Sequence, residues 1–353
     1  MSNGALTCYE ILEVHPRASA PVIEAAYKAI MKRHYPNGIN GDDRIARSLN
    51  AARETLIDMG KRSAYDDELV KKGERSVSQK DLIGKTVGDY RVLELIAEGG
   101  FGKTYKGEHL LLNTPVCIKH GHEISPQDEA ILVEEARAIW DLRHYGIPSM
   151  RGFLKLDDGS PMVIMSYIPG RTLEQLVDYH SEKKQRLDPE HVAWIIERSL
   201  NVLKYLHYHG IVHGDVKPQN IIVQKDHHLA LVDYGLSAIK PTSDSRNKGF
   251  TPYFAAPEEE ASGDNPLLPE SDFYGLGMTM IYALGGDVRS KKVPSSVPDA
   301  LCAFIKRLIV RDVSARPRWP KNEGEEDICD TIKKVRKEAF GRSHSNMRPI
   351  PGL

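Results

Sequence analysis

Polar side chains that could together transfer a phosphoryl group recur between residues 119 and 233. Such a transfer needs a carboxylate that orients the attacking hydroxyl, metal ligands that bridge the phosphates, and cations for the developing charge. Asp215 could supply the carboxylate, and Asn220 with Asp233 the metal ligands. Lys119 and Lys217 could supply the cations. Any one of these could be an ordinary surface residue, but their number and order favour an ATP-dependent phosphotransferase.

A glycine-rich turn at residues 98–103 precedes these positions. It lies between two expected strands, Arg91–Ile96 and Thr114–Lys119, whereas the glycines of a dinucleotide fold would open a helix. Glycines in a hairpin let backbone N–H groups approach phosphate oxygens. Alone, the turn is explained equally well as a flexible hairpin. Lys119 in the second strand, with Glu135 as its candidate partner, would add a cation for the phosphates; a solvated surface lysine is the alternative.

The elements around these residues change character along the chain. Apolar residues recur at helical spacing after Pro21 and again from about Arg44 to Ile57. The stretch Lys71–Lys85 is polar and without clear period, as in a linker, and strand-like segments follow it. After about Leu173 the helical spacing returns. This order predicts a small helical domain followed by a two-lobed enzyme with a cleft between its lobes.

The composition excludes several classes of protein. The chain has 353 residues, and its 48 basic and 49 acidic side chains nearly cancel, so we expect neither nucleic acid nor membrane as a partner. Hydrophobic residues make up 41% and charged residues 27%, which is typical of a globular chain. The four cysteines are scattered, which disfavours zinc and disulfides. With neither a signal peptide nor a bilayer-length apolar run in view, we expect a cytoplasmic protein.

Residues from about Tyr90 to Gly341 resemble the eukaryotic-type protein kinase family, which also occurs in bacteria. The matching motifs follow the family order: the glycine-rich loop Ile96–Tyr105, Lys119, Glu135, the catalytic loop His213–Asn220, the metal-binding triplet Asp233–Gly235, the triplet Ala256–Glu258, the helix at Ser271–Gly277, and Arg316. The resemblance implies that Asp272 braces the catalytic loop and that Arg316 pairs with Glu258. Lys217, two residues after Asp215, resembles the pattern of Ser/Thr kinases.

The family also implies the cofactors and the residues that bind them. ATP and Mg²⁺ are expected, with Mn²⁺ as an alternative metal, and Asn220 and Asp233 as the metal ligands. The implied catalytic residues are Asp215, Lys119, Lys217, Asn220 and Glu135. The implied nucleotide-binding residues are Ile96, Ala97, Gly99, Gly100, Phe101, Gly102, Thr104, Cys117, Lys119, Met165, Ser166, Ile168, Ile222 and Asp233.

Three features depart from the family pattern. Ala97 replaces the first glycine of the loop, which restricts the backbone there. Gly214 replaces the arginine that pairs with a phosphorylated activation loop, so activity should depend less on loop phosphorylation. Residues 286–300 are too short for the helix that docks substrates in the family, so we expect substrate recognition elsewhere, with the N-terminal domain as a candidate.

The N-terminal residues 5–69 resemble a J domain. The resemblance rests on Cys8–Val14 for the first helix and on Leu56–Asp66 for the ending L-x-D-x-x-K-R-x-x-Y-D. J domains stimulate a heat-shock ATPase chaperone through a His-Pro-Asp triplet. Here that position reads Tyr35-Pro36-Asn37, which lacks the carboxylate. We therefore expect the module to dock a partner, a substrate or its own kinase lobe, and doubt that it stimulates a chaperone.

The predicted fold is multidomain, with a small all-α J-like domain followed by a bilobal α+β kinase domain. The expected boundaries are 1–72 for the J-like module, 73–88 for a linker, 89–341 for the kinase domain (small lobe to about 168, large lobe 169–341), and 342–353 for a disordered tail. The predicted function is transfer of the γ-phosphate of ATP to Ser/Thr hydroxyls of proteins. The alternatives are a pseudokinase scaffold and a co-chaperone-type adaptor that works through the J-like module.

Overall fold

The structure is a computed structural model. It describes residues 7–12, 14, 18, 20–34, 43–58, 61–62, 65, 82–99, 102–121, 126–242, 249–260, 267–341 and 348–353. The chain divides into two compact units. The first comprises Met1–Ile83 and Glu98–Gly100, and the second comprises Gly84–Ala97 and Phe101–Leu353. Each unit is described by itself. The triplet Tyr35-Pro36-Asn37, together with Gly100 and Phe101, lies outside the described residues.

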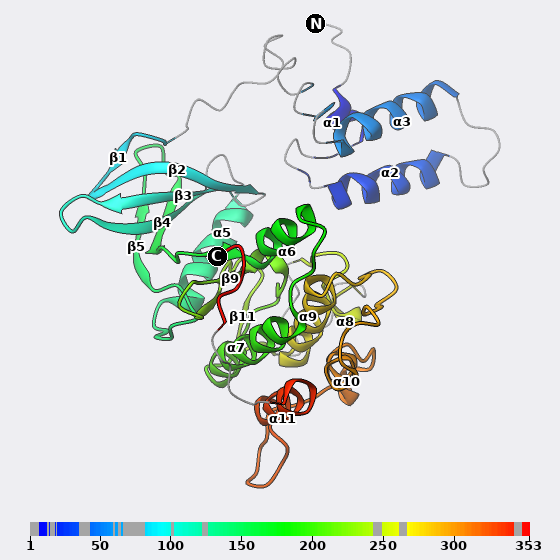
Figure 1. The fold of residues 1–353 in the computed structure, drawn as a ribbon. Coiled ribbons are helices and arrows are strands. Elements are labelled where there is room, and N and C mark those ends of the chain that lie inside the picture. The colour runs from blue at the N-terminus through cyan, green and yellow to red at the C-terminus, as the bar shows by residue number, and fades with distance from the viewer. Residues whose placement is uncertain are drawn as a thin grey trace, which may run out of the picture. The chain divides into compact units, whose positions relative to one another are not determined.

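The first unit contains the helices α1 (Cys8–Ile11), α2 (Ala20–His34) and α3 (Asp43–Ile57). Thr7 begins α1 with a capping box, because its hydroxyl accepts from Glu10 N and the Glu10 carboxylate accepts from Thr7 N. Figure 1 shows α2 and α3 side by side, and both α1 and α2 pack against α3. Helices α2 and α3 fall where the apolar spacing predicted them, and α1 falls where the resemblance to a J domain implied a helix.

A small apolar core holds these helices together: Tyr9, Leu12, Ile23, Ile30, Leu49, Ala52 and Leu56. The end of the module fastens onto its beginning. The hydroxyl of Tyr65 accepts a 2.8 Å hydrogen bond from Cys8 N, and Arg62 Nε donates to the hydroxyl of Tyr9 at 3.1 Å. The K-R-x-x-Y ending thus closes the helical unit on α1.

The second unit begins with a six-stranded sheet in the order β1-β2-β3-β4-β6-β5. The strands are β1 (Thr86–Val87), β2 (Tyr90–Gly99), β3 (Gly102–His109), β4 (Thr114–His120), β5 (Met150–Lys155) and β6 (Pro161–Ser166). The central pairs β3–β4, β4–β6 and β5–β6 are antiparallel. Helix α5 (Pro126–Ile139) packs against β5 and β6, as Figure 1 shows. This sheet and helix form the small lobe.

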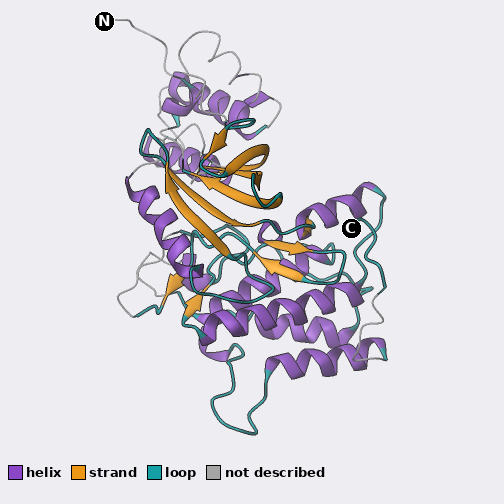
Figure 2. Cartoon of the chain, turned by 90° about the vertical axis from the view of Figure 1, so that its left-hand side faces the viewer, coloured by secondary structure: helices purple, strands orange, loops and turns teal. Residues whose placement is uncertain are grey.

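The large lobe is mostly helical, and Figure 2 shows its helices gathered apart from the main sheet. Its helices are α6 (Leu173–Glu182), α7 (Pro189–Tyr208), α8 (Pro257–Glu260), α9 (Pro269–Ala283), α10 (Asp299–Leu308) and α11 (Ile328–Phe340), with 3₁₀ turns η1 (Pro218–Asn220) and η2 (Val313–Ala315). Its short strands are β7 (Arg171–Thr172), β8 (Ile211–Val212), β9 (Ile221–Val223), β10 (Leu229–Leu231) and β11 (Ala238–Ile239). A strand-rich lobe followed by a helix-rich lobe is the predicted bilobal architecture.

Helix α9 lies at the centre of the large lobe. Nearly every residue from Ser271 to Ala283 is buried, which is expected of a helix that is apolar all round. Its small residues permit close contacts: a Cβ on Gly277 would lie 2.5 Å from the side chain of Ile309, and one on Gly275 3.0 Å from Val216 O. Asp272 is the buried acid on this helix, and it faces the catalytic loop described below.

The expectation of a disordered tail is wrong for residues 348–353. Ile350 is buried in the core of the large lobe, with only 4% of its surface exposed. Arg348 forms a 2.6 Å ion pair with Glu190 and a 3.0 Å pair with Asp188, and His180 Nε2 lies 3.1 Å from Pro351 O. The polar, proline-containing composition suggested disorder, but one apolar side chain and one arginine suffice to fasten a short segment to a preformed surface.

This docking predicts a stability effect for a single tail side chain. Replacing Ile350 with alanine should cost about 2 kcal/mol, because the change leaves a cavity in the core. Differential scanning fluorimetry should record a fall in melting temperature of roughly 4–8 °C. The matched control is the exposed neighbour Pro349→Ala, which should change the melting temperature little. Equal melting temperatures for Ile350→Ala and wild type would mean that the tail is not docked.

Candidate active site

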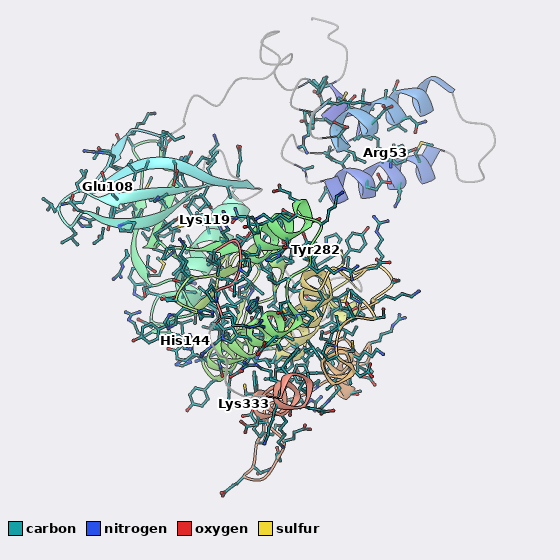
Figure 3. All side chains as sticks on the ribbon, viewed as in Figure 1. Arg53, Glu108, Lys119, His144, Tyr282 and Lys333 are labelled. Atoms are coloured by element: carbon teal, nitrogen blue, oxygen red, sulfur yellow. The ribbon has the colours of Figure 1, made fainter. Side chains whose placement is uncertain are left out.

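Lys119 links the small lobe to the large lobe through two carboxylates. It lies on β4, and its Nζ is 2.6 Å from Glu135 Oε2 on α5 and 2.9 Å from Asp233 Oδ1 beyond β10. The side chains of Lys119 and Glu135 are 11% and 2% exposed, whereas that of Asp233 is 43% exposed. Figure 3 labels Lys119 near the junction of the sheet with α5. The ion pair expected between Lys119 and Glu135 is therefore present, and Asp233 joins it.

The ammonium of Lys119 and the carboxylate of Asp233 each favour the charged form of the other. Removal from water opposes the charged form of Lys119, but the carboxylates of Asp233 and Glu135 outweigh this effect and raise the pKa of the ammonium. Desolvation likewise opposes the charge of Asp233, but Lys119 lowers the pKa of its carboxyl to about 2. Since Asp233 has a depressed pKa, its contribution to stability is present above its ordinary pKa of 3.8 and is lost as the pH falls toward 2. The Lys119–Asp233 pair therefore stays charged at neutral pH.

The apolar residues Leu231 and Val232 predict a strand across Leu231–Gly235, but Asp233 lies in a loop instead. Strand β10 ends at Leu231, and the backbone of Asp233 has a φ of +66°. This left-handed conformation is strained for a residue with a side chain and is incompatible with a strand at Asp233. Tyr234 N donates to Glu135 Oε1 at 3.3 Å, and the Tyr234 ring is buried beside that of His213. The apolar residues before Asp233 are typical of a strand, but the contacts with Lys119 and Glu135 redirect the chain.

Asp215 lies in a second cluster, held by three polar neighbours. Its Oδ2 is 2.6 Å from Lys217 Nζ and accepts from Asn220 Nδ2 at 3.0 Å. Its Oδ1 accepts a 2.6 Å hydrogen bond from the hydroxyl of Thr251, which also accepts from Lys217 Nζ at 3.1 Å. Asp215 is only 7% exposed. The carboxylate is therefore fixed in position before any substrate arrives.

The two clusters are joined through the backbone. Val232 N, next to Asp233, donates to the carbonyl of Asn220 at 2.9 Å. On the other side, Asp272 of α9 accepts 2.8 Å hydrogen bonds from the backbone N–H groups of His213 and Gly214. The expectation that Asp272 braces the catalytic loop is thus confirmed. These bonds couple the loop that carries Asp215 to the most buried helix of the lobe.

Arg316 and Glu258 form the second predicted pair. The guanidinium donates from Nη1 to Glu258 Oε1 at 2.6 Å and from Nη2 to Oε2 at 2.7 Å. This bidentate geometry is the strong form of an arginine–carboxylate pair. The side chain of Arg316 is fully buried, so the pair anchors α8, and with it the segment that contains Thr251, to the large lobe. The prediction of this pair is confirmed.

Two glycines around the site cannot be replaced without strain. Gly102 has a φ of +120°, and a Cβ there would lie 2.0 Å from the carbonyl oxygen of His120. Gly214 has a φ of +75°, and a Cβ would lie 2.5 Å from the Leu267 side chain and 2.8 Å from Leu236 O. The glycine that stands where the family has an arginine is therefore built into the packing beside Asp215.

The described residues that the resemblance implies for nucleotide binding lie mostly on the strands β2, β3, β4, β6 and β9. Cys117 is opposite Met165 in the β4–β6 register, and Thr104 is opposite Lys119 in the β3–β4 register. The Ser166 backbone N–H donates to Ser149 O at 2.8 Å. The remaining described members are Ile96 and Ala97 on β2, Gly99 at its end, Ile168 after β6, and Ile222 on β9.

The oxygen atoms near Asp233 suit a magnesium ion that is shared with phosphates. Asn220 uses Nδ2 for the backbone carbonyl and Oδ2 of Asp215, which leaves its Oδ1 as the atom that can accept a metal. In the part of the chain that the structure describes, no cluster of three or more His, Cys, Asp or Glu side chains could hold a metal by itself. Mg²⁺ typically takes one or two protein ligands and completes its shell with phosphates and water, so Asn220 and Asp233 fit this role.

Sequence reasoning missed Glu259, a buried acid beside the catalytic loop. Its side chain accepts a 2.8 Å hydrogen bond from Ala256 N, and the residue is 8% exposed. Burial, with the nearby charges of Asp272, Glu258 and Asp215, raises its pKa to about 8. Glu259 is the middle one of three consecutive glutamates at 258–260, and no pattern in the sequence distinguishes it as buried.

The raised pKa predicts how stability changes with pH. Folded Glu259 binds a proton that the unfolded chain releases between pH 4.5 and 8, so stability falls as the pH rises through this window. At pH 7 the Glu259→Gln variant should therefore have a free energy of unfolding about 3 kcal/mol higher than wild type, and a melting temperature roughly 6–12 °C higher. Both differences should shrink toward pH 5. The exposed Glu338→Gln is the control. Parallel melting curves for Glu259→Gln and wild type across pH 5–8 would contradict this account.

Comparisons with known proteins agree with this geometry. The family model described as "Protein kinase domain" matches residues 90–323. The chain belongs to the protein kinase family. A second model, described as "DnaJ domain", matches residues 7–66, so the chain carries a J domain ahead of the kinase domain. The bilobal unit with its Lys119–Glu135 pair is consistent with the first match, and the helical unit with the second.

Individual relatives share the kinase portion at moderate identity. The serine/threonine-protein kinase pkn3 of Myxococcus xanthus is 29% identical over 60% of this chain and 40% of its own length. The maternal embryonic leucine zipper kinase of Danio rerio is 29% identical over 68% of this chain and 34% of its own. The serine/threonine-protein kinase PrkC of Bacillus subtilis (strain 168) is 26% identical over 74% of this chain and 39% of its own. The chain therefore spans about two fifths or less of these relatives.

Across the described residues, no helix is both long and apolar enough for a bilayer span.

Proposed function

We propose that the chain is an ATP-dependent protein kinase that phosphorylates serine and threonine hydroxyls of other proteins. The observation that carries the proposal is the fixed carboxylate of Asp215, held by Lys217, Asn220 and Thr251 beside the Lys119 triad. The named serine/threonine kinases among its relatives support the choice of acceptor.

Each side chain has a definite task in this proposal. Asp215 orients the acceptor hydroxyl and receives its proton, and its position depends on the bonds from Thr251 and Asn220. Lys217, 2.6 Å from Asp215, places a positive charge where charge develops on the transferred group. Lys119, oriented by Glu135, contributes the cation for the ATP phosphates. Mg²⁺, held by Asn220 and Asp233, would supply further neutralisation of phosphate charge.

A pseudokinase scaffold is the second candidate function, suggested by Ala97 and Gly214. Gly214 does not favour it, because its left-handed φ and close packing make glycine a requirement of this loop geometry. The polar residues of the proposed mechanism are all present, and each hydrogen-bonds within one of the two clusters around Lys119 and Asp215: Lys119, Glu135, Asp233, Asp215 and Asn220. We therefore place catalysis first.

The four cysteines are unpaired, which supports the further proposal of a reducing, cytoplasmic location.

The test is phosphoryl transfer by the full chain. The protein is incubated with γ-labelled ATP, Mg²⁺ and casein or myelin basic protein, and the labelled protein is hydrolysed to its phosphoamino acids. We expect label on phosphoserine and phosphothreonine. The rate of label transfer by wild type should far exceed that of the Asp215→Asn variant. Label on neither, or equal label from both proteins, would favour the scaffold.

We propose that the J domain docks a partner or substrate without stimulating a chaperone. The proposal rests on the replacement of His-Pro-Asp by Tyr35-Pro36-Asn37, which removes the carboxylate that the family uses. The folded module offers exposed polar side chains for docking, such as Lys28 on α2, whose side chain is 71% exposed. A co-chaperone role would require stimulation of a heat-shock ATPase, for which the family uses the aspartate that this triplet lacks.

The chaperone assay compares the full chain with a double variant, Tyr35→His with Asn37→Asp, which restores the triplet. We expect the wild-type chain to leave the steady-state ATP turnover of a purified heat-shock ATPase unchanged and the double variant to raise it. Stimulation by the wild-type chain that equals that of an intact J domain would overturn the proposal.

A further inference from the structure

The loop between α9 and α10 forms a tight turn that presents three cations. Asp287 organises it: its carboxylate accepts from Arg289 N at 2.9 Å and from the Ser290 hydroxyl at 2.7 Å. The backbones of Asp287 and Lys292 exchange two hydrogen bonds, of 2.9 and 3.0 Å. Arg289, Lys291 and Lys292 are all exposed. The segment is too short for a helix, as expected, yet it has a defined conformation.

Arg289 faces the segment that contains Thr251, and Lys291 faces α9. The guanidinium of Arg289 lies over the ring of Tyr253, 5.4 Å from its centroid, and Lys291 Nζ lies 5.1 Å from the ring centroid of Tyr274. In the described part of the chain, no ion pair joins Arg289, Lys291 or Lys292 to a carboxylate. The only acid in the turn, Asp287, is engaged by the turn itself. We call Arg289, Lys291 and Lys292 the cationic rim. Their positive charge is therefore available to a ligand.

The distance from this rim to the site of chemistry is short. The hydroxyl of Thr251 touches Asp215 at 2.6 Å, and Tyr253 is two residues further along the chain. Two residues span at most about 7 Å, so with the reach of the Tyr253 side chain the Arg289 guanidinium lies on the order of 10–15 Å from the catalytic carboxylate. A peptide in extended conformation rises about 3.3 Å per residue, and it covers this distance in about three or four residues.

The surface between the rim and Asp215 is suited to a peptide. Phe250 and Tyr253, on either side of Thr251, are 45% and 47% exposed although both are large aromatic residues. Tyr253 has a φ of +72°, which is strained for an aromatic residue and is held by its surroundings. Aromatic side chains that lie exposed beside a catalytic group are typical of binding surfaces. Phe250 and Tyr253 thus expose apolar surface next to Thr251, and Arg289 adds a cation at Tyr253.

We propose that Arg289, Lys291 and Lys292 select protein substrates that carry aspartate or glutamate about three or four residues from the phosphorylated serine or threonine. The inference rests on the proposed kinase function and gives its substrate a chemical class. Arginine is suited to the role because its planar guanidinium binds a carboxylate through two hydrogen bonds while stacking on an aromatic ring. The expectation that substrate recognition lies away from this short loop is thereby revised.

The expected effect is moderate and depends on salt. Exposed ion pairs change affinity by a factor of up to about five each, so three cations should favour an acidic peptide over its neutral counterpart by roughly 5–30-fold in kcat/KM. Because the charges are exposed, the preference should weaken at an ionic strength near 1 M, where the Debye length is about 3 Å.

The experiment uses the full chain and synthetic peptides with one central serine and one fixed residue at each of the four positions on either side. The ratio of kcat/KM for glutamate-containing and glutamine-containing peptides is measured for wild type, Arg289→Glu, and the triple variant Arg289→Ala, Lys291→Ala, Lys292→Ala. The control variant is Lys334→Ala with Lys337→Ala, which removes exposed cations from α11. Melting temperatures verify that each variant is folded.

We expect a glutamate preference of 5-fold or more at a position three or four residues from the serine. It should disappear in the triple variant, weaken in Arg289→Glu, where Lys291 and Lys292 remain, and persist in the α11 control. A ratio near one for wild type, or an unchanged ratio in the triple variant, would overturn the inference while leaving the kinase function intact. Transfer to no peptide and to no protein would instead contradict the proposed function, and the inference with it.

Discussion

Replacing Asp215 with asparagine is expected to lower the rate of phosphoryl transfer by about 10²–10⁴-fold, the range for loss of a positioned acid–base group. Asparagine is nearly isosteric, so the contacts from Thr251 and Asn220 can largely remain, but its amide cannot accept the proton of the acceptor hydroxyl. The affinity for ATP should change little, because Asp215 is assigned to the acceptor and not to the nucleotide. The loss should therefore appear in kcat.

The measurement is steady-state kinetics with a peptide substrate, together with nucleotide affinity from calorimetry. The control is Asp157→Asn, an exposed aspartate in the turn between β5 and β6, which should leave kcat unchanged. A variant at Asp215 that keeps more than about a tenth of wild-type kcat would remove the catalytic base from the account.

Replacing Lys119 with methionine should damage both the nucleotide site and the fold. The substitution leaves the buried carboxylate of Glu135 without its 2.6 Å partner, and Asp233 without the charge that lowers its pKa. Removing one member of a buried ion pair typically costs about 3–5 kcal/mol, and the melting temperature should fall by roughly 6–15 °C. ATP affinity should fall at least about tenfold, because a cation beside the phosphates is lost.

A second substitution separates these two effects. Lys119→Met combined with Glu135→Gln removes the uncompensated buried charge, so part of the lost stability should return while phosphoryl transfer remains absent. Differential scanning fluorimetry and the transfer assay report the two quantities independently. If the single variant melts like wild type, the burial and pairing described for Lys119 are wrong.

The order of elements and several contacts were predictable from the sequence. Helix α3 spans Asp43–Ile57 where apolar spacing indicated a helix from about Arg44, and β4 begins at Thr114 as expected. The pairing of Arg316 with Glu258 was implied by motif order alone. Such predictions succeed because local periodicity reports burial, and because the motifs of a family fix which residues meet across long stretches of chain.

Other features depend on tertiary contacts that no local pattern reveals. Leu231-Val232 looks like the continuation of a strand, but Asp233 turns toward Lys119. Glu259 is a charged residue type, which indicates exposure, and only the packing of α8 places its side chain in the interior. Ile350 sits in a segment whose composition is typical of disorder, and its burial requires the surface formed by α6 and α7. In each case the surroundings, not the residue type, determine the outcome.

The central claim is that side chains distant in sequence form one site for ATP and a divalent metal. Calorimetric titration of ADP tests it most directly, in the presence and absence of Mg²⁺, for wild type and Asp233→Asn. We expect Mg²⁺ to tighten the binding of ADP to wild type at least several-fold and the variant to lose this gain, because its amide lacks the carboxylate charge that attracts the metal. Metal-independent binding to wild type, or an equal gain in both proteins, would contradict it.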